Sequence, residues 1–226
     1  MSDPRLAQTD GRTRFLHLLR DTGVYAVTDD SLAPERLTQT TRNLLEAGVR
    51  LFQYRDKTRP DGQRVDLAAK LVDLVHSAGG LLLVNDRADI ALAAEADGAH
   101  LGQDDLPVEI GRVMMGPRLV LGASASYLPE LEPARAEGAD YIGFGAVYGT
   151  DTKPDAEYAG LDLFEEACRR STLPVVGIGG ISVERAAAVI GRGATGVAVV
   201  SALFRADDPG AAARKLLEEV RKAKGA

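Results

Sequence analysis

The chain has 226 residues, of which 45% are hydrophobic and 27% are charged, and its formal net charge is -6 at pH 7. This acidic balance argues against a nucleic-acid-binding protein, and no apolar run reaches the ~20 residues needed to span a bilayer. The single cysteine, Cys168, excludes an internal disulfide and a zinc site made of cysteines. Residues 1–10 do not resemble a signal peptide, so we expect a cytoplasmic protein.

Apolar runs of strand length alternate with amphipathic helical patterns from the beginning of the chain to its end. Strands are expected at residues 24–27, 49–53, 81–84, 99–101, 119–122, 141–144, 175–178 and 196–200. Helices are expected at residues 34–47, 65–78, 90–96, 108–115, 129–137, 162–170, 183–192 and 209–224. An additional helix at residues 13–20, within an N-terminal extension of residues 1–22, is expected to cover the bottom of the fold.

This alternation predicts an α/β fold with a parallel sheet, and eight strands are the number that closes a (β/α)8 TIM barrel. Similar segments, EAGVRLFQ, EADGAHLG, EGADYIGFG and RGATGVAVV, recur at intervals that suggest pseudo-fourfold symmetry. The alternative, a doubly wound sheet, lacks its G-x-G-x-x-G fingerprint after the first strand. We therefore expect one TIM-barrel domain over residues 1–226.

Polar residues that follow each strand are the candidates for a site, because TIM barrels place their active sites at the carboxyl ends of the strands. After the second strand, Gln53, Arg55 and Lys57 share one face and continue the row of Val49 and Leu51 into the barrel mouth. An amide, a guanidinium and an ammonium in one row suit a polyanion. The alternative is a solvated strand end whose cations pair with Asp56 and Asp61.

Two further strands end abruptly in acidic groups. Asn85 and Asp86 follow the third strand, and Asp105 follows the fourth. Two carboxylates at one end of a parallel sheet are a typical Mg²⁺ site in proteins that also bind phosphate. The alternative is that Asp86 and Asp105 cap the helices that follow them.

The loop after the sixth strand contains two glycines, followed by Thr150, Thr152 and Lys153. Glycines let the backbone approach a ligand closely, and the hydroxyls and the ammonium are hydrogen-bond donors. Considered alone, this segment reads more readily as an ordinary surface loop.

The loops after the last two strands are the usual phosphate site of this fold. The first contains Gly180 and opens a helix, and the second contains Val200 and Ser201. Backbone amides at such positions bind anions, although small residues also allow close helix–strand packing. Together with the cationic cluster, they predict two anion sites, which suits the joining of two phosphorylated molecules with loss of pyrophosphate.

The sequence from residue 24 to residue 204 resembles the thiamine phosphate synthase family. The resemblance rests on Q-x-R-x-K at residues 53–57, VNDRADIALAAEADGAHLGQDDLP, GADYIGFG, TDTK and PVVGIGGI followed by GVAVVSA. It implies a transferase that couples hydroxymethylpyrimidine pyrophosphate to hydroxyethylthiazole phosphate after the pyrimidine pyrophosphate ionises. The expected partners are these small molecules, with no nucleic acid and no membrane, and a homo-oligomer is left open.

The resemblance also implies roles for individual residues. The Mg²⁺ carboxylates would be Asp86 and Asp105, and Gln53 would orient a substrate. The pyrophosphate ligands would be Arg55, Lys57, Asn85, Ser124 and Lys153. All of them except Asn85 would also have catalytic roles. Thiazole phosphate would bind at Thr150, Thr152, Gly180, Val200 and Ser201.

Two positions depart from the family pattern. Ser126 stands where the family commonly has histidine, and Tyr148 with Gly149 replaces the usual Phe-Pro. The histidine position bears on an alternative activity, a thiazole tautomerase, which needs a general acid–base there. A barrel that binds thiamine phosphate without catalysis is a second alternative. His100 is expected to be a core residue or to support the site.

Overall fold

The computed structural model describes residues 10–149 and 158–225 of the chain. Its centre is a closed barrel of eight parallel strands in the order β1 to β8, with β8 pairing back onto β1. The strands are β1 (Val24–Val27), β2 (Leu51–Tyr54), β3 (Leu81–Asn85), β4 (Gly98–Leu101), β5 (Val120–Ala125), β6 (Tyr141–Phe144), β7 (Val175–Ile178) and β8 (Gly196–Val199). The expected (β/α)8 barrel is confirmed.

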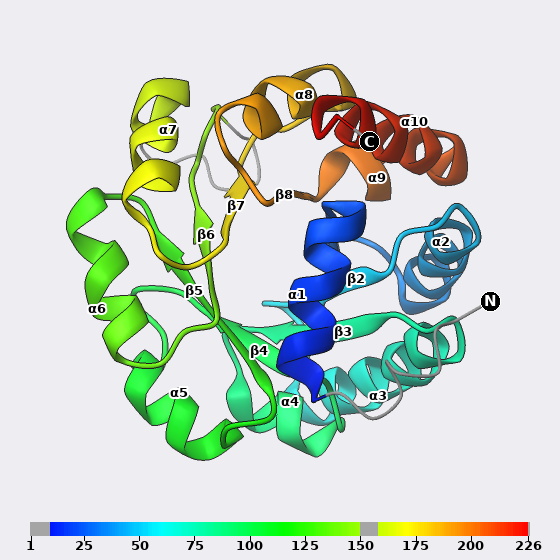
Figure 1. Ribbon diagram of the computed structural model, residues 1–226. Helices are drawn as coiled ribbons and strands as arrows, with labels where there is room; N and C mark the ends of the chain where they lie inside the picture. Colours follow the sequence, from blue (N-terminus) through cyan, green and yellow to red (C-terminus); the bar gives the residue numbers. More distant parts are fainter. Residues whose placement is uncertain (1–9, 150–157, 226) are drawn as a thin grey trace.

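Helices surround this barrel, as Figure 1 shows. They are α2 (Pro34–Glu46), α3 (Asp61–Ser77), α4 (Ala88–Ala93), α5 (Val108–Met115), the short 3-10 helix Leu128–Glu130, α6 (Leu131–Ala136), α7 (Gly160–Arg170), α8 (Val183–Gly191), α9 (Ser201–Phe204) and α10 (Pro209–Ala223). Within the described ranges, no helix is long and apolar enough to cross a bilayer.

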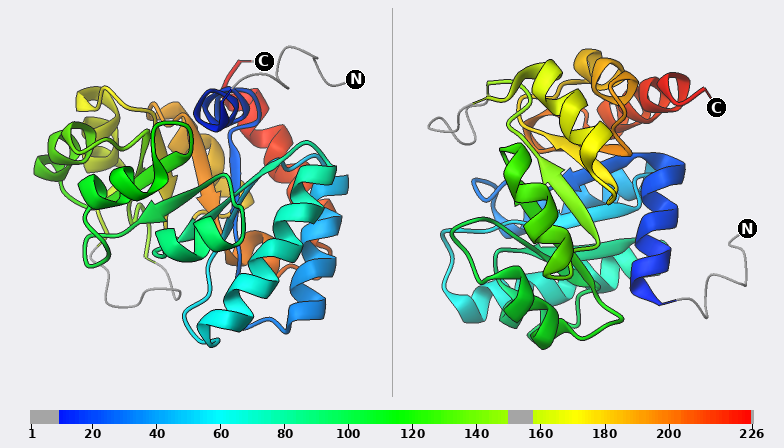
Figure 2. Two further views of the ribbon diagram at one scale, coloured as in Figure 1. Left: turned by 90° about the horizontal axis from the view of Figure 1, so that it is seen from below. Right: turned by 60° about the vertical axis from the view of Figure 1, so that its left-hand side comes forward.

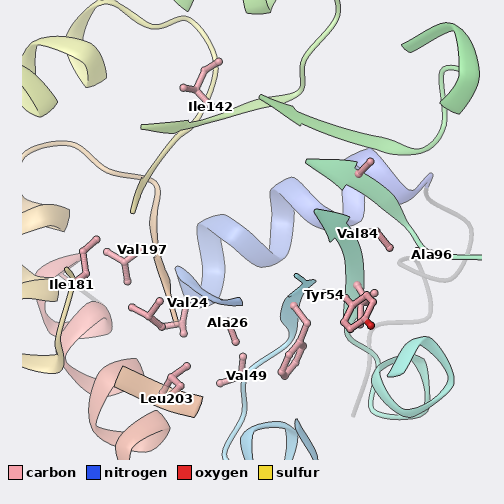
Figure 3. Packing of buried hydrophobic residues seen from close by; sticks show 14 of the residues in the cluster. Val24, Ala26, Val49, Tyr54, Val84, Ala96, Ile142, Ile181, Val197 and Leu203 are labelled. Atoms are coloured by element: carbon pink, nitrogen blue, oxygen red, sulfur yellow. The ribbon is translucent and has the colours of Figure 1, made fainter. Parts of the chain in front are cut away.

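Side chains alternate between two apolar layers because successive residues of a strand point to opposite faces. The outer layer lies between strands and helices and includes Val24, Tyr54 and Val84, which Figure 3 labels. The inner layer fills the barrel and includes Tyr25, Leu51 and other residues of opposite parity. This alternation decides which residues can face a site inside the barrel.

The N-terminal helix α1 (Gly11–Thr22) lies across the end of the barrel where the strands begin, as expected. Its residue Phe15 is fully buried in the inner layer. At its far end, the ammonium of Lys224 on α10 donates to the carbonyls of Leu19 and Arg20. Figure 2 shows the two helices side by side. The opposite end of the barrel stays open for a ligand.

Two of the recurring segments perform the same structural task. Asp97, just before β4, accepts a hydrogen bond from the backbone N–H of Leu82 at 2.8 Å. Asp140, just before β6, accepts one from the backbone N–H of Leu121, also at 2.8 Å. Each carboxylate therefore links the start of an even-numbered strand to the strand before it. The recurring sequence segment thus corresponds to a recurring hydrogen bond.

Some predicted boundaries were wrong. Helix α3 begins at Asp61, four positions before the expected start at residue 65, because Pro60 and Asp61 already form a helix start. Strand β5 runs on to Ala125 because it pairs with β6 as far as Phe144, despite its small residues. The short helix α9 after β8 was not predicted.

Candidate active site

A cavity with about 980 Å³ of empty space, part of it open to solvent, lies at the carboxyl ends of the strands. It is lined mainly by the last inward-facing residue of each strand and by the loops that follow. Those that carry the argument are Gln53, Arg55, Asn85, His100, Ser124, Gly180, Val200 and Ser201. The structure therefore brings together most of the residues that the sequence singled out.

The polar row after β2 points into this cavity. Gln53 is 4% exposed, and the side chain of Arg55 is 14% exposed. Nη1 of Arg55 lies 3.2 Å from Oδ2 of Asp30, in the loop after β1. For Gln53 and Arg55 the interpretation as a solvated strand end is therefore wrong, because both line the cavity wall. The side chain of Lys57 is 47% exposed and is not part of that wall.

Two predictions about the residues on this face of the second strand need correction. Leu51 lies in the inner layer as expected, but Val49 packs in the outer layer, because β2 begins only at Leu51. Asp56 and Asp61 do not pair with Arg55 or Lys57. They pair with Arg59, Arg64 and Arg87.

Lys57 lies beyond the end of β2 and crosses to the neighbouring strand. Its Nζ lies 2.9 Å from Oδ2 of Asp86, and its backbone N–H donates to Asp30 at 3.2 Å. The ammonium is therefore positioned between the cationic row and the acidic residues that follow β3 and β4.

Asp86 and Asp105 form the acidic pair. Each carboxyl is close enough to shift the pKa of the other. Burial opposes ionisation of Asp86, but its contacts with Asp105 and Lys57 outweigh that effect and lower the pKa of Asp86. Burial and the neighbouring Asp86 raise the pKa of Asp105. One carboxyl is thus favoured as the anion and its neighbour is disfavoured, as expected for two carboxylates at one site.

Neither aspartate caps a helix. Helix α4 is preceded by Arg87 at the N-cap position and α5 by Pro107, and neither N-cap makes a side-chain capping bond. Asp86 has a φ of 65°, a left-handed conformation that Asp and Asn tolerate better than most residues. The capping interpretation is therefore wrong.

This pair fits a Mg²⁺ ion. Within residues 10–149 and 158–225, no three His, Cys, Asp or Glu side chains gather to hold a metal, so the protein would contribute two carboxylates. That donor set is typical of Mg²⁺, which keeps waters and takes its remaining ligands from substrate phosphates. A structural zinc site needs four protein ligands, which are not gathered there.

The loops after β7 and β8 line the other side of the cavity. Gly180 has a φ of +60°, and a Cβ there would lie 2.4 Å from the carbonyl oxygen of Gly149. Only glycine therefore fits between the two loops. Ser201 is exposed toward the cavity at the start of α9, next to Val200. Backbone amides and one hydroxyl are thus the donors on this side.

A chain of hydrogen bonds crosses the floor of the cavity. Nε2 of Gln53 donates to the hydroxyl of Tyr25 at 3.1 Å, and this hydroxyl lies 3.1 Å from that of Tyr141. Tyr141 contacts Nδ1 of His100 at 2.9 Å, and Nε2 of His100 contacts Oγ of Ser124 at 2.9 Å. Because an amide nitrogen only donates, Tyr25 accepts from Gln53, and the contacts continue from there to Ser124.

Ser124 is the end of this chain that lines the cavity beside the anion-binding residues. A serine hydroxyl both donates and accepts, so it can donate to an anionic ligand.

Comparison with known proteins agrees with this arrangement. The sequence profile described as "Thiamine monophosphate synthase" matches residues 24–203. The chain belongs to the thiamine monophosphate synthase family.

Individual members of the family are also similar. The chain is 46% identical over 195 residues to a thiamine-phosphate synthase of Roseiflexus, covering 85% of this chain and 83% of that protein. It is 52% identical over 183 residues to the "Thiamine biosynthesis bifunctional protein ThiM/ThiE" of Symbiobacterium thermophilum. That match covers 80% of this chain but only 38% of the relative, so the chain spans well under half of the bifunctional protein.

A solved structure, thiamine phosphate pyrophosphorylase from Pyrococcus furiosus, superposes with a TM-score of 0.84 at 35% identity. The superposition covers 91% of this chain and 98% of the other. The resemblance inferred from the motifs is thereby confirmed.

Three residues that the family resemblance singles out, Thr150, Thr152 and Lys153, lie outside the described residues. At one departure from the family pattern, the hydroxyl of Ser126 donates to the carbonyl of Gly145 at 2.8 Å. At the other, the ring centroid of Tyr148 lies 4.7 Å from Cζ of the Arg185 guanidinium, a cation–π contact.

Sequence reasoning missed several residues that hold the site. Asp30 fixes Arg55 and the backbone of Lys57, and Tyr25 and Tyr141 support the cavity floor. The period of two along a strand could have identified the tyrosines, because each lies two residues before an inward-facing position of its own strand. Asp30 carried no such signal because it lies in a loop.

Proposed function

We propose that this protein couples hydroxymethylpyrimidine pyrophosphate to hydroxyethylthiazole phosphate, giving thiamine phosphate and pyrophosphate. The observation that supports it best is that one cavity joins two anion-binding sides of different chemistry. Arg55 and Asn85 line one side of the cavity, and Asp86, which pairs with Lys57, directly follows Asn85. The glycine and serine donors after β7 and β8 line the other side. Family membership and the names of its relatives point the same way.

In this reaction the bond between the pyrimidine methylene carbon and the pyrophosphate oxygen breaks, and its electron pair leaves with pyrophosphate. The thiazole nitrogen then gives its lone pair to the methylene carbon. No proton has to move, so the chain's own task is to bind the leaving group. Arg55 offers a planar fork, Lys57 a point charge and Ser124 a hydroxyl donor.

Asp86 and Asp105 would hold Mg²⁺. The bound ion would supply charge that stabilises the departing pyrophosphate. The ion pair between Lys57 and Asp86 suits this arrangement, because the ammonium is already beside the carboxylate that an incoming cation and polyanion would approach.

A methylene cation reacts readily with water, so the cavity has to exclude water from the reacting carbon. Its inner wall includes Val27, Ile178 and Ala198, which are apolar. Thiazole phosphate would bind opposite, with its monophosphate at the backbone of Gly180 and at Ser201. This arrangement places the nucleophile across the cavity from the leaving group.

The test is to mix both purified substrates with the protein and Mg²⁺ and to quantify thiamine phosphate and pyrophosphate. We expect both in equal amounts, with no product in excess EDTA and recovery when Mg²⁺ is restored. Ser201→Ala should raise KM for thiazole phosphate by about tenfold to a hundredfold, for one lost hydrogen bond to a charged group, and leave KM for the pyrimidine unchanged.

Absence of product under metal-replete conditions would contradict the proposal and favour a barrel that only binds. Isomerisation of the thiazole without coupling would instead indicate the tautomerase. No contact favours that activity, because the position of its acid–base residue carries Ser126, whose hydroxyl is engaged with Gly145.

A further inference from the structure

Three aromatic rings pack against one another beneath the cavity. One of them comes from a helix outside the eight strand–helix units. Phe15, on α1, has its ring centroid 4.7 Å from that of Tyr141 and 5.8 Å from that of Tyr25. The two tyrosine rings are 6.1 Å apart. All three side chains are 1% exposed or less.

The hydroxyls of these tyrosines contact residues that line the cavity, while their rings pack against Phe15. Each hydroxyl holds a cavity-lining residue: Tyr25 holds Gln53, and Tyr141 holds His100. Burial raises the pKa of both phenols well above the ordinary value, so both keep the protons that the chain of hydrogen bonds uses.

Two glycines provide the space for this arrangement. A Cβ at Gly122 would lie 2.4 Å from Nδ1 of His100 and 2.4 Å from Cζ of Tyr141. A Cβ at Gly143 would lie 2.9 Å from Cε1 of His100. The imidazole and the phenol are therefore confined by backbone at their sides, which leaves Phe15 as the support from below.

Helix α1 is itself fixed to the barrel. Nη2 of Arg12 lies 2.6 Å from Oδ1 of Asp140, the residue directly before Tyr141. The side chain of Asp10 caps the helix by accepting from the N–H of Thr13 at 2.8 Å. The family profile begins at residue 24, after this helix, so family membership assigns no role to it.

We infer that Phe15 is a positioning residue for the active site: its ring holds Tyr25 and Tyr141 so that Gln53, His100 and Ser124 face the substrates. This inference deepens the proposed function and rests on it. A smaller side chain at this position leaves space into which both rings can tilt. Their hydroxyls then move, and the donors at the cavity floor move with them.

The test compares Phe15→Ala with a matched control, Leu19→Ala. Leu19 lies on the same helix, is equally buried and packs toward Gly196 at the start of β8. Both variants should lower the melting temperature. At a temperature where both are folded, Phe15→Ala should lose about tenfold to a hundredfold in kcat, since small misplacement of a site is costly, while Leu19→Ala stays within about twofold.

A second readout does not depend on activity. The chain has six tyrosines, and ring signals of labelled tyrosine can be assigned by Tyr25→Phe and Tyr141→Phe. Phe15→Ala should shift the signals of both tyrosines, and Leu19→Ala should leave them in place. Phe15→Leu, which keeps an apolar side chain against both rings, should recover most of kcat and serves if the alanine variant does not fold.

Equal losses of kcat in Phe15→Ala and Leu19→Ala would overturn the inference, as would unmoved tyrosine signals. If the wild-type protein forms no product, the proposed function fails separately. The tyrosine signals then still decide whether Phe15 holds the two rings.

Discussion

The ammonium nitrogen of Lys57 lies 2.9 Å from Oδ2 of Asp86, which joins the loop after β2 to the end of β3 at the mouth of the barrel. The side chain of Lys57 is 47% exposed. Exposed ion pairs contribute only about 0–1 kcal/mol to stability, so this one can open at little cost when a polyanion enters. The position of Lys57 therefore points to ligand binding more than to folding.

Lys57→Gln should leave the melting temperature nearly unchanged and lower kcat/KM at least tenfold, about 1.4 kcal/mol of barrier. The control is Lys222→Gln on α10, where Nζ lies at the same distance, 2.9 Å, from Oε1 of Glu218 in a more exposed pair. That variant should keep full activity. Equal kinetics for both variants would place Lys57 outside the pyrophosphate site.

The aspartate pair should act as a unit. Asp86→Asn and Asp105→Asn are each expected to lower kcat/KM on the order of 100-fold, about 2.7 kcal/mol of barrier. The double variant should lose far less than the product of the two single losses, since residues that share one task are non-additive. Asparagine is the suitable replacement at 86 because it tolerates the left-handed backbone there.

Steady-state kinetics at saturating Mg²⁺, followed by a Mg²⁺ titration, checks this prediction. Single variants should need more Mg²⁺ for half-maximal rate. Losses that simply add in free energy would indicate two independent roles.

Arg55→Lys should not be conservative, because lysine keeps the charge but loses the planar fork and the contact with Asp30. We expect kcat to fall about tenfold or more, with a melting temperature close to that of the wild type. Arg36→Lys, at an exposed position on α2, is the control and should change neither quantity. Wild-type rates in Arg55→Lys would show that the fork does not touch the substrate.

Ser126 should be dispensable for coupling but measurable in stability. Its hydroxyl donates to the carbonyl of Gly145, so Ser126→Ala should lower the free energy of unfolding by about 1 kcal/mol. Because the attacking thiazole nitrogen already carries a lone pair, kcat should stay within about twofold of the wild-type value. Denaturant unfolding tests the predicted loss of stability, and steady-state rates test the predicted kcat. A hundredfold loss of kcat would mean that the hydroxyl takes part in the reaction.

Stability should also depend on pH through His76, far from the cavity. Nε2 of His76 lies 2.8 Å from Asp97, and this hydrogen bond raises the pKa of His76 above its ordinary value. A raised pKa in the folded state stabilises the protein below the unfolded pKa of about 6.5, and this stabilisation disappears as pH rises through the folded pKa. The stability difference between wild type and His76→Gln should therefore be largest near about pH 5.5 and smaller at about pH 8.5.

Denaturant unfolding across this range measures that difference. A difference for His76→Gln that is constant with pH, or that grows as pH rises, would contradict the assignment.

Strand parity and strand ends were readable in the sequence because they are local. A period of two places Leu51, Gln53 and Arg55 on one face whatever the partner strand is, and the abrupt change from apolar to acidic residues at Asp86 marks the end of a buried strand. The number of such units predicted the barrel, and the fold rule then placed the site at one end. The fold and the main candidate residues therefore followed from the sequence itself.

Only the tertiary structure decided which of these residues meet. Tyr25 and Tyr141 are 116 positions apart, and their hydroxyls come within 3.1 Å because closure of the barrel by β1 and β8 brings β1 opposite β6. The packing of α1 against the barrel places Phe15 under both rings, and the direct pairing of β3 with β4 brings the residues that follow these strands, Asp86 and Asp105, to the same edge. Long-range contacts of this kind depend on strand order, register and the absence of side chains at Gly122 and Gly143, and no local pattern encodes those distances.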